Sequence, residues 1–276
     1  MEIKNIYVET YGCAANQNNS EIIAGLLSTH GLNIVSNKEI ADLAILNTCI
    51  VKGPTEQRMK FRIKELYKEF KHNLVITGCM PDVKLQDISN IAPLASIIGS
   101  HYIHKIPSTI KKMTSGKKIE KAGIANEMKL CMPKIKQNKI IGITQILEGC
   151  TGNCSFCITK KAKGELFSYP ESMIIKNIKY DIATGCKEIW LTSQDNAAYG
   201  LDKGEYKLVK LLNKITNIKG KFLIRIGMMN PNHVLNILED LIQCYYSEKI
   251  FKFLHIPLQS GSDKILEDMN LSLIHI

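Results

Sequence analysis

The sequence lacks any apolar run long enough to cross a membrane, and it lacks a secretory leader. Its 276 residues contain no uninterrupted apolar stretch of the roughly twenty residues that a spanning helix needs. The chain opens with Met1-Glu2-Ile3-Lys4-Asn5 and leads directly into a strand-like alternation, with no basic segment before an apolar one. Internal repeats and low-complexity tracts are also missing. We therefore expect a cytoplasmic globular protein.

Acidic residues are the scarcer charged type. The chain has 26 Asp and Glu against 36 Lys and Arg, for a net charge of +10. A basic surface attracts polyanions. A solvated, lysine-rich surface from an AT-rich genome would give the same charge, because Ile, Lys and Asn are all frequent here. Charge alone does not decide between these two interpretations.

Strand-like and helical segments alternate along the chain, which is typical of α/β proteins with parallel sheets. In the first hundred residues we expect strands at 6–10, 42–47, 74–77 and 96–99, and helices at 20–27 and 55–70. Later strands are expected at 140–147, 188–192, 222–227 and 251–256, with helical segments around 171–184, 206–217 and 231–246. This second series has fewer steps than the eight of a closed barrel.

The segment between the two series is basic and rich in breakers. Residues 105–139 contain ten lysines and two acids, which indicates a linker with a short helix around Ser108 to Met113. We therefore expect an N-terminal parallel-sheet domain over 1–106, a basic linker over 107–138 and an incomplete (β/α) partial barrel over 139–276. A partial barrel that stops at Ile276 would leave an open edge strand, so a truncated sequence is expected.

Nine cysteines are many for a reducing compartment, where metal binding explains tight groups better than disulfides do. Cys150, Cys154 and Cys157 form a C-x-x-x-C-x-x-C group after an expected strand. Three thiolates can ligate three corners of a cubane iron–sulfur cluster and leave one iron open. The alternatives are three core thiols or a zinc site without its fourth ligand, although zinc sites favour paired C-x-x-C halves.

Cys13, Cys49 and Cys79 are far apart in the sequence, yet each follows an expected strand. The carboxyl ends of parallel strands lie on one edge of a sheet, so we expect these thiols to gather there. A nearby helix N-terminus also favours the thiolate. The pattern favours a second three-cysteine cluster over three buried small hydrophobic residues.

The residues around both groups resemble the signatures of one family. Tyr11-Gly12-Cys13, Asn47-Thr48-Cys49 and Thr77-Gly78-Cys79 are similar to the signatures of the methylthiotransferase amino-terminal domain, and Gly149 to Cys157 resembles the radical S-adenosylmethionine motif. The segments Thr159–Leu166, Ser168–Pro170 and Glu188–Gly200 resemble the archaeal and eukaryotic branch, which acts on N6-threonylcarbamoyladenosine in tRNA. Branches that act on isopentenyladenosine or on a ribosomal-protein aspartate usually carry proline where Lys160 stands.

The resemblance implies a tRNA-modifying methylthiotransferase with two 4Fe-4S clusters and S-adenosylmethionine as cofactors. Reductive cleavage of S-adenosylmethionine at the cluster of the catalytic Cys150, Cys154 and Cys157 would give a radical that abstracts hydrogen from carbon 2 of the adenine at position 37. The second cluster would supply sulfur, which a second S-adenosylmethionine methylates. The implied partners are the tRNA anticodon loop, a reductant and a sulfur donor, with no membrane. Other family members end in a small RNA-binding β-barrel, which we do not expect in this chain.

Contacts to S-adenosylmethionine are expected from the cluster motif and from the carboxyl ends of the barrel strands. By position the candidates are Phe156, Ser193, Gln194, Asp195, Arg225, Gln259, Ser260 and Gly261. Each of them has an ordinary structural role as its alternative.

Other functions are also compatible with the sequence. They are a sibling methylthiotransferase for isopentenyladenosine or a ribosomal-protein aspartate, a non-catalytic iron–sulfur electron-transfer protein, and a zinc-stabilised RNA-binding module. Iron and sulfide content separates the zinc module from the rest. Cleavage of S-adenosylmethionine then separates enzymes from an electron carrier, and the product separates the enzymes.

Overall fold

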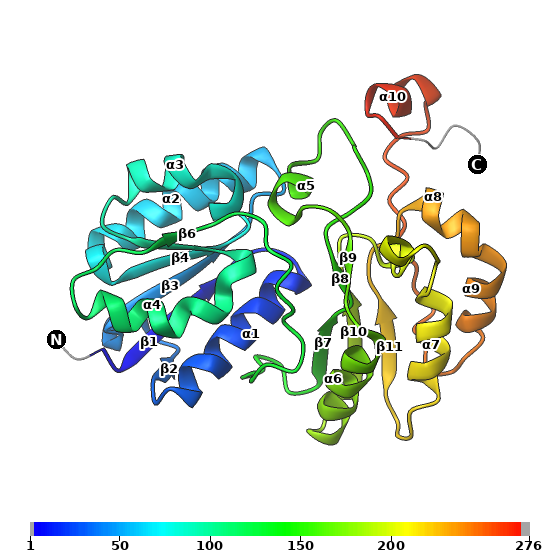
Figure 1. Ribbon diagram of the computed structural model, residues 1–276, viewed down its shortest axis with the longest axis horizontal. Coiled ribbons are helices and arrows are strands. Elements are labelled where there is room, and N and C mark those ends of the chain that lie inside the picture. Colours follow the sequence, from blue (N-terminus) through cyan, green and yellow to red (C-terminus); the bar gives the residue numbers. More distant parts are fainter. Residues whose placement is uncertain (1–2, 272–276) are drawn as a thin grey trace. The chain divides into compact units, whose positions relative to one another are not determined.

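The computed structural model describes residues 3–271, and it divides into two compact units, Met1–Ile135 and Lys136–Ile276 (Figure 1). We call them unit 1 and unit 2. Both are α/β structures with parallel central strands. In the described part of the chain no helix combines the length and the apolar character needed to cross a membrane.

Unit 1 is built on a six-stranded parallel sheet in the order β2-β1-β3-β4-β5-β6. Its strands are β1 (Asn5–Thr10), β2 (Asn33–Val35), β3 (Leu43–Thr48), β4 (Leu74–Gly78), β5 (Ser96–Gly99) and β6 (Glu120–Lys121). The chain runs from β1 to β2 and then crosses to β3 on the other side of β1. The reversal of direction at β1 and β3 is a topological switch point, and ligands of open α/β sheets bind beside such points.

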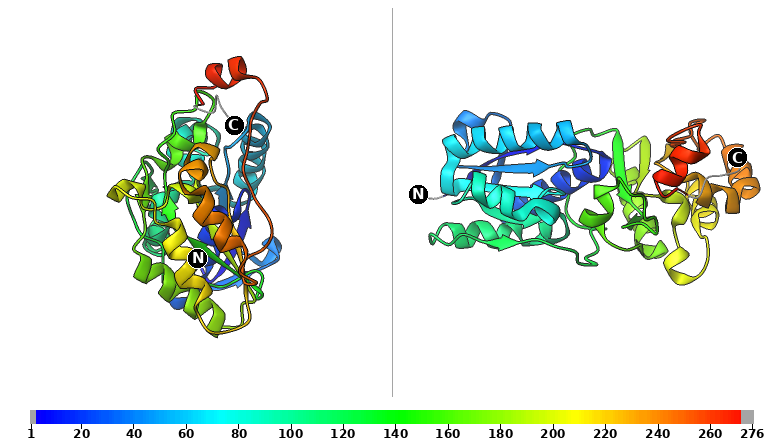
Figure 2. Two further views of the ribbon diagram at one scale, coloured as in Figure 1. Left: turned by 90° about the vertical axis from the view of Figure 1, so that its right-hand side faces the viewer. Right: turned by 90° about the horizontal axis from the view of Figure 1, so that it is seen from above.

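Helices cover both faces of this sheet (Figure 1). They are α1 (Ala14–Thr29), α2 (Gly53–Phe70), α3 (Pro81–Ile91) and α4 (Ile106–Met113), with short 3-10 turns at Lys38–Ile40, Lys71–Asn73 and Ser100–Lys105. Figure 2 shows α1 and α2 on opposite faces. On the α1 side, Ile22 and Ile23 pack with Ile106 and Ile110 of α4 against the strands, in one apolar cluster. Burial of each such side chain contributes about 1.5–3 kcal/mol.

Helix α1 is longer than the sequence predicts, because it starts at Ala14 and not near residue 20. After Ala14 and Ala15, residues 16–20 are all polar, so the first two turns carry no apolar periodicity from which a helix is recognised. Nevertheless, Asn16, Asn18 and Asn19 are buried. The helix therefore begins directly after Cys13, in a stretch where hydrophobic pattern gives no signal.

Residues 106–121 lie in the segment where the sequence predicts a linker. They form α4 and β6, and β6 pairs in parallel with β5. Lys111 and Lys112 of α4 are exposed, while Ile106, Ile110 and Met113 are buried. The basic composition of the segment thus belongs partly to an amphipathic helix of unit 1.

Unit 2 contains a three-stranded parallel sheet in the order β11-β10-β7 and a short antiparallel pair, β8 with β9. The strands are β7 (Ile141–Gln145), β8 (Leu147–Glu148), β9 (Phe167–Ser168), β10 (Glu188–Thr192) and β11 (Leu223–Ile226). The helices are α5 (Ile158–Lys163), α6 (Glu171–Ala183), α7 (Leu208–Thr216), α8 (Pro231–Val234), α9 (Leu238–Tyr245) and α10 (Asp263–Asp268), with 3-10 turns at Asn196–Ala198, Leu201–Lys203 and Leu235–Ile237. Strands and helices alternate as in an incomplete (β/α) barrel.

The fourth strand expected in this series, at 251–256, is not formed, so that prediction is wrong. The segment follows an isolated bridge between Ile224 of β11 and Ile250, and the amide of Phe251 donates to the carbonyl of Ile224 at 3.0 Å. The amide of Met229 also donates to the carbonyl of His255 at 3.0 Å. Phe253 and Leu254 are exposed, so neither face of the segment is buried in a way that would favour regular pairing.

Candidate iron–sulfur sites

Cys13, Cys49 and Cys79 emerge at the same edge of the unit 1 sheet. Cys13 is the N-cap residue of α1, while Cys49 and Cys79 follow β3 and β4 by one residue. The strand ends are in register, with Thr10 opposite Asn47 and β3 paired with β4 up to its last residue. The site thus lies beside the topological switch point between β1 and β3.

Glycines bring the backbone close to these thiols. Gly12 has φ +115°, and a Cβ there would lie 3.0 Å from the Cβ of Cys49 and 3.2 Å from its Sγ. Gly78 has φ +96°, and a Cβ there would overlap the carbonyl oxygen of Thr48. Larger residues would have to displace the cysteine loops, and L side chains rarely adopt these φ values.

The donor set of this site consists of soft sulfur atoms, which suit iron–sulfur clusters better than hard cations. Among residues 3–271 no three His, Cys, Asp or Glu side chains are close enough to hold a single metal ion. A cubane attaches each thiolate to a different iron, so its ligands stand further apart than those of one ion. Burial raises the pKa of the Cys49 thiol, so cluster assembly must remove a proton from it. The residues fit a cluster.

The second group of thiols, Cys150, Cys154 and Cys157, lies on one loop of unit 2. The loop follows β8, and Cys157 is the N-cap residue of α5. Burial raises the pKa values of the Cys150 and Cys154 thiols. The amide of Gly152 donates to Cys150 Sγ at 3.3 Å, and that of Cys157 donates to the carbonyl of Cys154 at 3.1 Å. This set of three soft donors also fits a cluster with one open iron.

The base of this loop is held by three contacts. The amide of Gly149 donates to Gln194 Oε1 at 2.9 Å, and that of Cys150 donates to the carbonyl of Gly164 at 3.3 Å. Lys160 Nζ donates to the carbonyl of Cys150 and to Glu165 Oε2, the latter at 2.7 Å. The lysine that marks the branch in the sequence therefore reaches back to the first cysteine of the loop.

Ser193 and Asp195, two of the predicted cofactor contacts, belong to a buried polar group next to the loop. Asp195 is fully buried, and its Oδ1 accepts the amides of Ala197 at 3.1 Å and Asn230 at 3.0 Å. Burial raises the pKa of Asp195 to about 6. Within the described residues, Asp195 Oδ2 and Ser193 Oγ have no hydrogen-bond partner. Buried polar atoms of this kind are rare and are typical of ligand sites.

His233 connects this group to the cluster loop, and the sequence gives no local signal for it. Its Nε2 lies 2.9 Å from Thr151 Oγ1 and 3.8 Å from Asp195 Oδ2, while its Nδ1 lies 3.0 Å from the Tyr206 hydroxyl. Burial lowers the pKa of His233, which favours the neutral ring. A cavity of about 470 Å³ opens here, lined by Thr151, Gly152, Asn153, Cys154, Asn230, Asn232, His233, Glu267, Asn270 and Leu271.

The other predicted cofactor contacts are not among the described residues that line this cavity. Arg225 packs its guanidinium over the rings of Trp190 and Phe253, 4.7 and 5.1 Å from their centroids. Phe156, on the cluster loop, is 53% exposed. The segment 259–261 is largely exposed and precedes α10. The end of α10 does reach the loop, because the amide of Ser155 donates to the carbonyl of Met269 at 3.0 Å.

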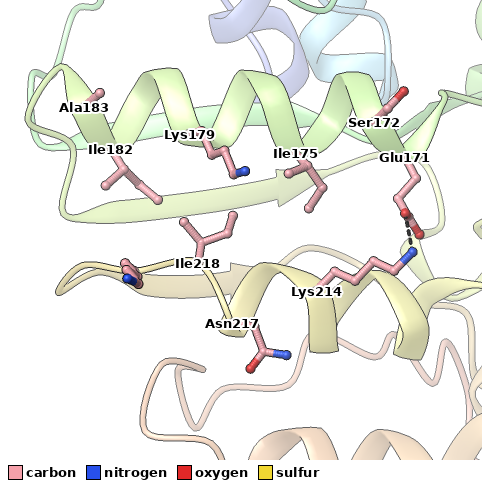
Figure 3. A pocket seen from close by; sticks show the side chains of 10 residues that line it. Glu171, Ser172, Ile175, Lys179, Ile182, Ala183, Lys214, Asn217 and Ile218 are labelled. Atoms are coloured by element: carbon pink, nitrogen blue, oxygen red, sulfur yellow. Dashed lines mark hydrogen bonds and ion pairs between the residues drawn. The ribbon is translucent and has the colours of Figure 1, made fainter.

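A larger cavity, about 810 Å³, lies elsewhere in unit 2, between α6 and the residues at and beyond the end of α7 (Figure 3). Its walls include Ile175, Ile182 and Ile218. Lys214 at its rim pairs with Glu171 at 2.6 Å. Its described lining residues include none of the six candidate cysteines. Size therefore does not identify the reactive site in this molecule.

Each unit of the chain matches a different family model. Residues 5–99 match the uncharacterized protein family UPF0004, and residues 144–273 match the radical SAM superfamily. A domain of that superfamily uses an iron–sulfur cluster and S-adenosylmethionine. The chain also resembles, in fold, the radical S-adenosylmethionine methyltransferase TsrM from Kitasatospora setae, with a TM-score of 0.67 and 11% identity over 98% of this chain and 63% of that one.

Among curated relatives, a probable threonylcarbamoyladenosine tRNA methylthiotransferase of Methanothermobacter thermautotrophicus is 41% identical over 96% of this chain and 62% of its own length. The threonylcarbamoyladenosine tRNA methylthiotransferase of Mus musculus is 35% identical over 97% of this chain and 47% of its own length. The chain thus spans about three fifths of the archaeal relative. Similarity of this extent across both units makes the chain a member of the radical S-adenosylmethionine methylthiotransferase family, in the archaeal and eukaryotic branch.

Proposed function

We propose that this chain carries the catalytic part of a tRNA methylthiotransferase that converts N6-threonylcarbamoyladenosine, next to the anticodon, to its 2-methylthio derivative. The observation that carries the proposal is the presence of two separate three-thiol sites in one chain. Formation of a carbon–sulfur bond at an unactivated ring carbon needs both a radical generator and a sulfur source. The names of the curated relatives support the choice of substrate.

In unit 2, Cys150, Cys154 and Cys157 would hold the radical cluster. When bound, this cluster supplies the electron for reductive cleavage of S-adenosylmethionine. Gln194 and Lys160 hold the loop at its base through Gly149 and the carbonyl of Cys150. A fixed loop keeps the open iron in one position, which is the protein's contribution to such chemistry.

Polar groups beside the loop would bind S-adenosylmethionine. Asp195 Oδ2 and Ser193 Oγ lack hydrogen-bond partners within the described residues. Leaving such atoms unsatisfied costs about 1–3 kcal/mol each. A polar ligand that pairs with them recovers this free energy. An ionised Asp195 suits a cationic or hydroxyl-bearing ligand. Gln194 already accepts a hydrogen bond from the loop, at the amide of Gly149, and therefore has a positioning role.

In unit 1, Cys13, Cys49 and Cys79 would hold the second 4Fe-4S cluster, which serves as the site of sulfur delivery. Cys49 and Cys79 are buried while Cys13 is exposed. The site is thus open on one side, where a substrate base can approach. The positively charged chain attracts the tRNA anticodon loop, whose splayed bases are accessible to side chains. A reductant and a sulfur donor complete the set of partners, in a cytoplasmic setting.

Anaerobic reconstitution tests the proposal. The chain should bind about eight irons and eight sulfides, and form 5′-deoxyadenosine when S-adenosylmethionine and dithionite are added. Incubation with tRNA that contains N6-threonylcarbamoyladenosine should then give the 2-methylthio nucleoside, detected by mass spectrometry after digestion. About four irons, unchanged in a Cys13→Ala, Cys49→Ala, Cys79→Ala variant, would overturn the assignment of the second cluster.

A further inference from the structure

The first turns of α1 bury polar side chains where a helix against a sheet normally buries apolar ones. Asn16 is 1% exposed, Asn18 is 2% exposed and Asn19 is fully buried. Asparagine is mostly an exposed residue and has weak helix propensity. Burial of its amide costs free energy unless hydrogen bonds compensate for the lost water. Of these three residues, Asn16 makes hydrogen bonds that connect it to the cysteine loops.

The side-chain amide of Asn16 touches all three cysteine-bearing loops. Its Nδ2 donates to the carbonyl of Tyr11 at 2.8 Å and to the carbonyl of Thr48 at 2.8 Å. Its Oδ1 lies 3.6 Å from Cys79 Sγ. Tyr11 stands two residues before Cys13, and Thr48 directly precedes Cys49. Two carbonyl acceptors fix which end of the amide carries nitrogen.

The backbone of Asn16 is held from the other side. Its carbonyl accepts Asn47 Nδ2 at 2.8 Å, and the same nitrogen donates to Ser20 Oγ at 2.8 Å. Thr10 Oγ1 donates in turn to Ser20 Oγ at 2.7 Å. A Cβ at Gly12 would lie 2.9 Å from Asn16 Nδ2, so a larger residue at Gly12 would crowd the amide. The strand ends thus form a network centred on Asn16.

We infer that Asn16 is a positioning residue for the second cluster: one amide fixes the spacing of the loops that carry Cys13, Cys49 and Cys79, and places its oxygen beside the Cys79 sulfur. The inference rests on the proposed function and deepens it. Outer hydrogen bonds of this kind orient ligands and tune the potential of a metal centre. The negative end of the amide dipole near an iron-bound sulfur favours the oxidised, more positive state of the cluster.

The test uses the 276-residue chain with alanine at Cys150, Cys154 and Cys157, so that iron reports on unit 1 alone. In this parent, Asn16→Ala should lower the affinity for the cluster by about 10–100-fold. The cluster that remains should have altered electron paramagnetic resonance g-values and a higher midpoint potential. Asn73→Ala is the matched control, because Asn73 Nδ2 also donates to a backbone carbonyl in unit 1, that of Asp42 at 3.0 Å.

The control lies at the opposite edge of the sheet and should keep the iron content, g-values and potential of the parent. Asn16→Asp keeps the shape of the side chain but lacks both N–H donors. The same measurements are made on this variant if the alanine variant fails to fold. Iron content, g-values and potential that match the parent in both Asn16 variants would overturn the inference. A parent that binds no iron would instead overturn the second cluster itself, and the inference with it.

Discussion

The two three-cysteine sites differ in how the sequence builds them. In unit 1 the thiols come from three separate strand ends, and the sheet ladder sets their spacing. In unit 2 the thiols share one short loop, anchored at its base by Gln194 and Lys160. The first site therefore exists only when the sheet has formed, whereas the ligands of the second are neighbours in the sequence and stay within a few residues of one another even before unit 2 folds.

This difference predicts how metal binding is linked to folding. A cluster that binds only the folded arrangement of its ligands adds its binding free energy to the stability of that arrangement. A cluster in unit 1 bridges β1, β3 and β4, so it should stabilise the whole sheet. A cluster in unit 2 should stabilise mainly its own loop and the residues that touch it, including Thr151 and His233.

The largest expected effect comes from removing one site at a time. The variant with alanine at Cys150, Cys154 and Cys157 should lose 5′-deoxyadenosine formation entirely, because no open iron remains to bind S-adenosylmethionine. Alanine at Cys13, Cys49 and Cys79 should leave 5′-deoxyadenosine formation intact and abolish the methylthio product. Chromatographic measurement of both products in both variants checks this. Loss of S-adenosylmethionine cleavage in the unit 1 variant would contradict two independent sites.

A smaller effect is expected for Gly78→Ala, which disturbs the three-cysteine site at the edge of the unit 1 sheet. The new Cβ would overlap the Thr48 carbonyl at φ +96°. We expect a loss of about 2–4 kcal/mol in the free energy of unfolding and reduced iron in unit 1. The control is Gly31→Ala, with φ +78° and no atom within 4 Å of the new Cβ, which should cost about 1 kcal/mol. Equal losses in urea titrations of the two variants would refute the steric argument.

A matched comparison sharpens the contrast in unit 2. Gly149 has φ +74°, and a Cβ there would overlap the carbonyl of Glu165. Because the loop is local, Gly149→Ala should reduce 5′-deoxyadenosine formation while leaving the iron of unit 1 unchanged. Gly78→Ala should do the reverse. If either glycine variant removed iron from both units, the sites would not be independent in folding.

The next effect concerns pH and belongs to unit 2. Asp195 has a pKa near 6 when folded, against about 3.9 when unfolded. Asp195 therefore binds more protons in the folded state between these values, and its contribution to stability falls as the pH rises from about 4 to about 6. The expected loss is about 2–3 kcal/mol in the cluster-free chain. Asp195→Asn should remove this pH dependence, whereas Asp240→Asn, at an exposed position, should leave it unchanged in urea titrations at both pH values.

The sequence allowed the cysteine edge of unit 1 to be predicted for a physical reason. Parallel strands place all their carboxyl ends on one edge, so three cysteines after three strands must emerge together. The structure places Cys13, Cys49 and Cys79 in this way, and their role as ligands stays a prediction. The alternation of strands and helices likewise predicted both α/β units.

Other features could not be predicted from local pattern. The first turns of α1 are polar, so neither the start of the helix nor the burial of Asn16 could be predicted from apolar spacing. Hydrogen bonds, and not apolar packing, compensate for the burial of the Asn16 amide. The contact of His233 with Thr151 joins residues 82 positions apart. The segment 251–256 has strand-like composition, but strand formation depends on a neighbour that buries one face.

The smallest effect tests the base of the unit 2 loop. Lys160→Met removes the hydrogen bond to the carbonyl of Cys150, and we expect a loss of about 1 kcal/mol in the free energy of unfolding. Glu165→Gln removes only the ion pair with Lys160, and because Glu165 is 86% exposed the expected loss is below about 0.5 kcal/mol. Urea titration of each variant of the chain measures both losses. If Glu165→Gln cost as much as Lys160→Met, the ion pair and not the carbonyl contact would hold the loop, and the unit 2 site would depend on salt concentration in a way that the sheet-built site of unit 1 does not.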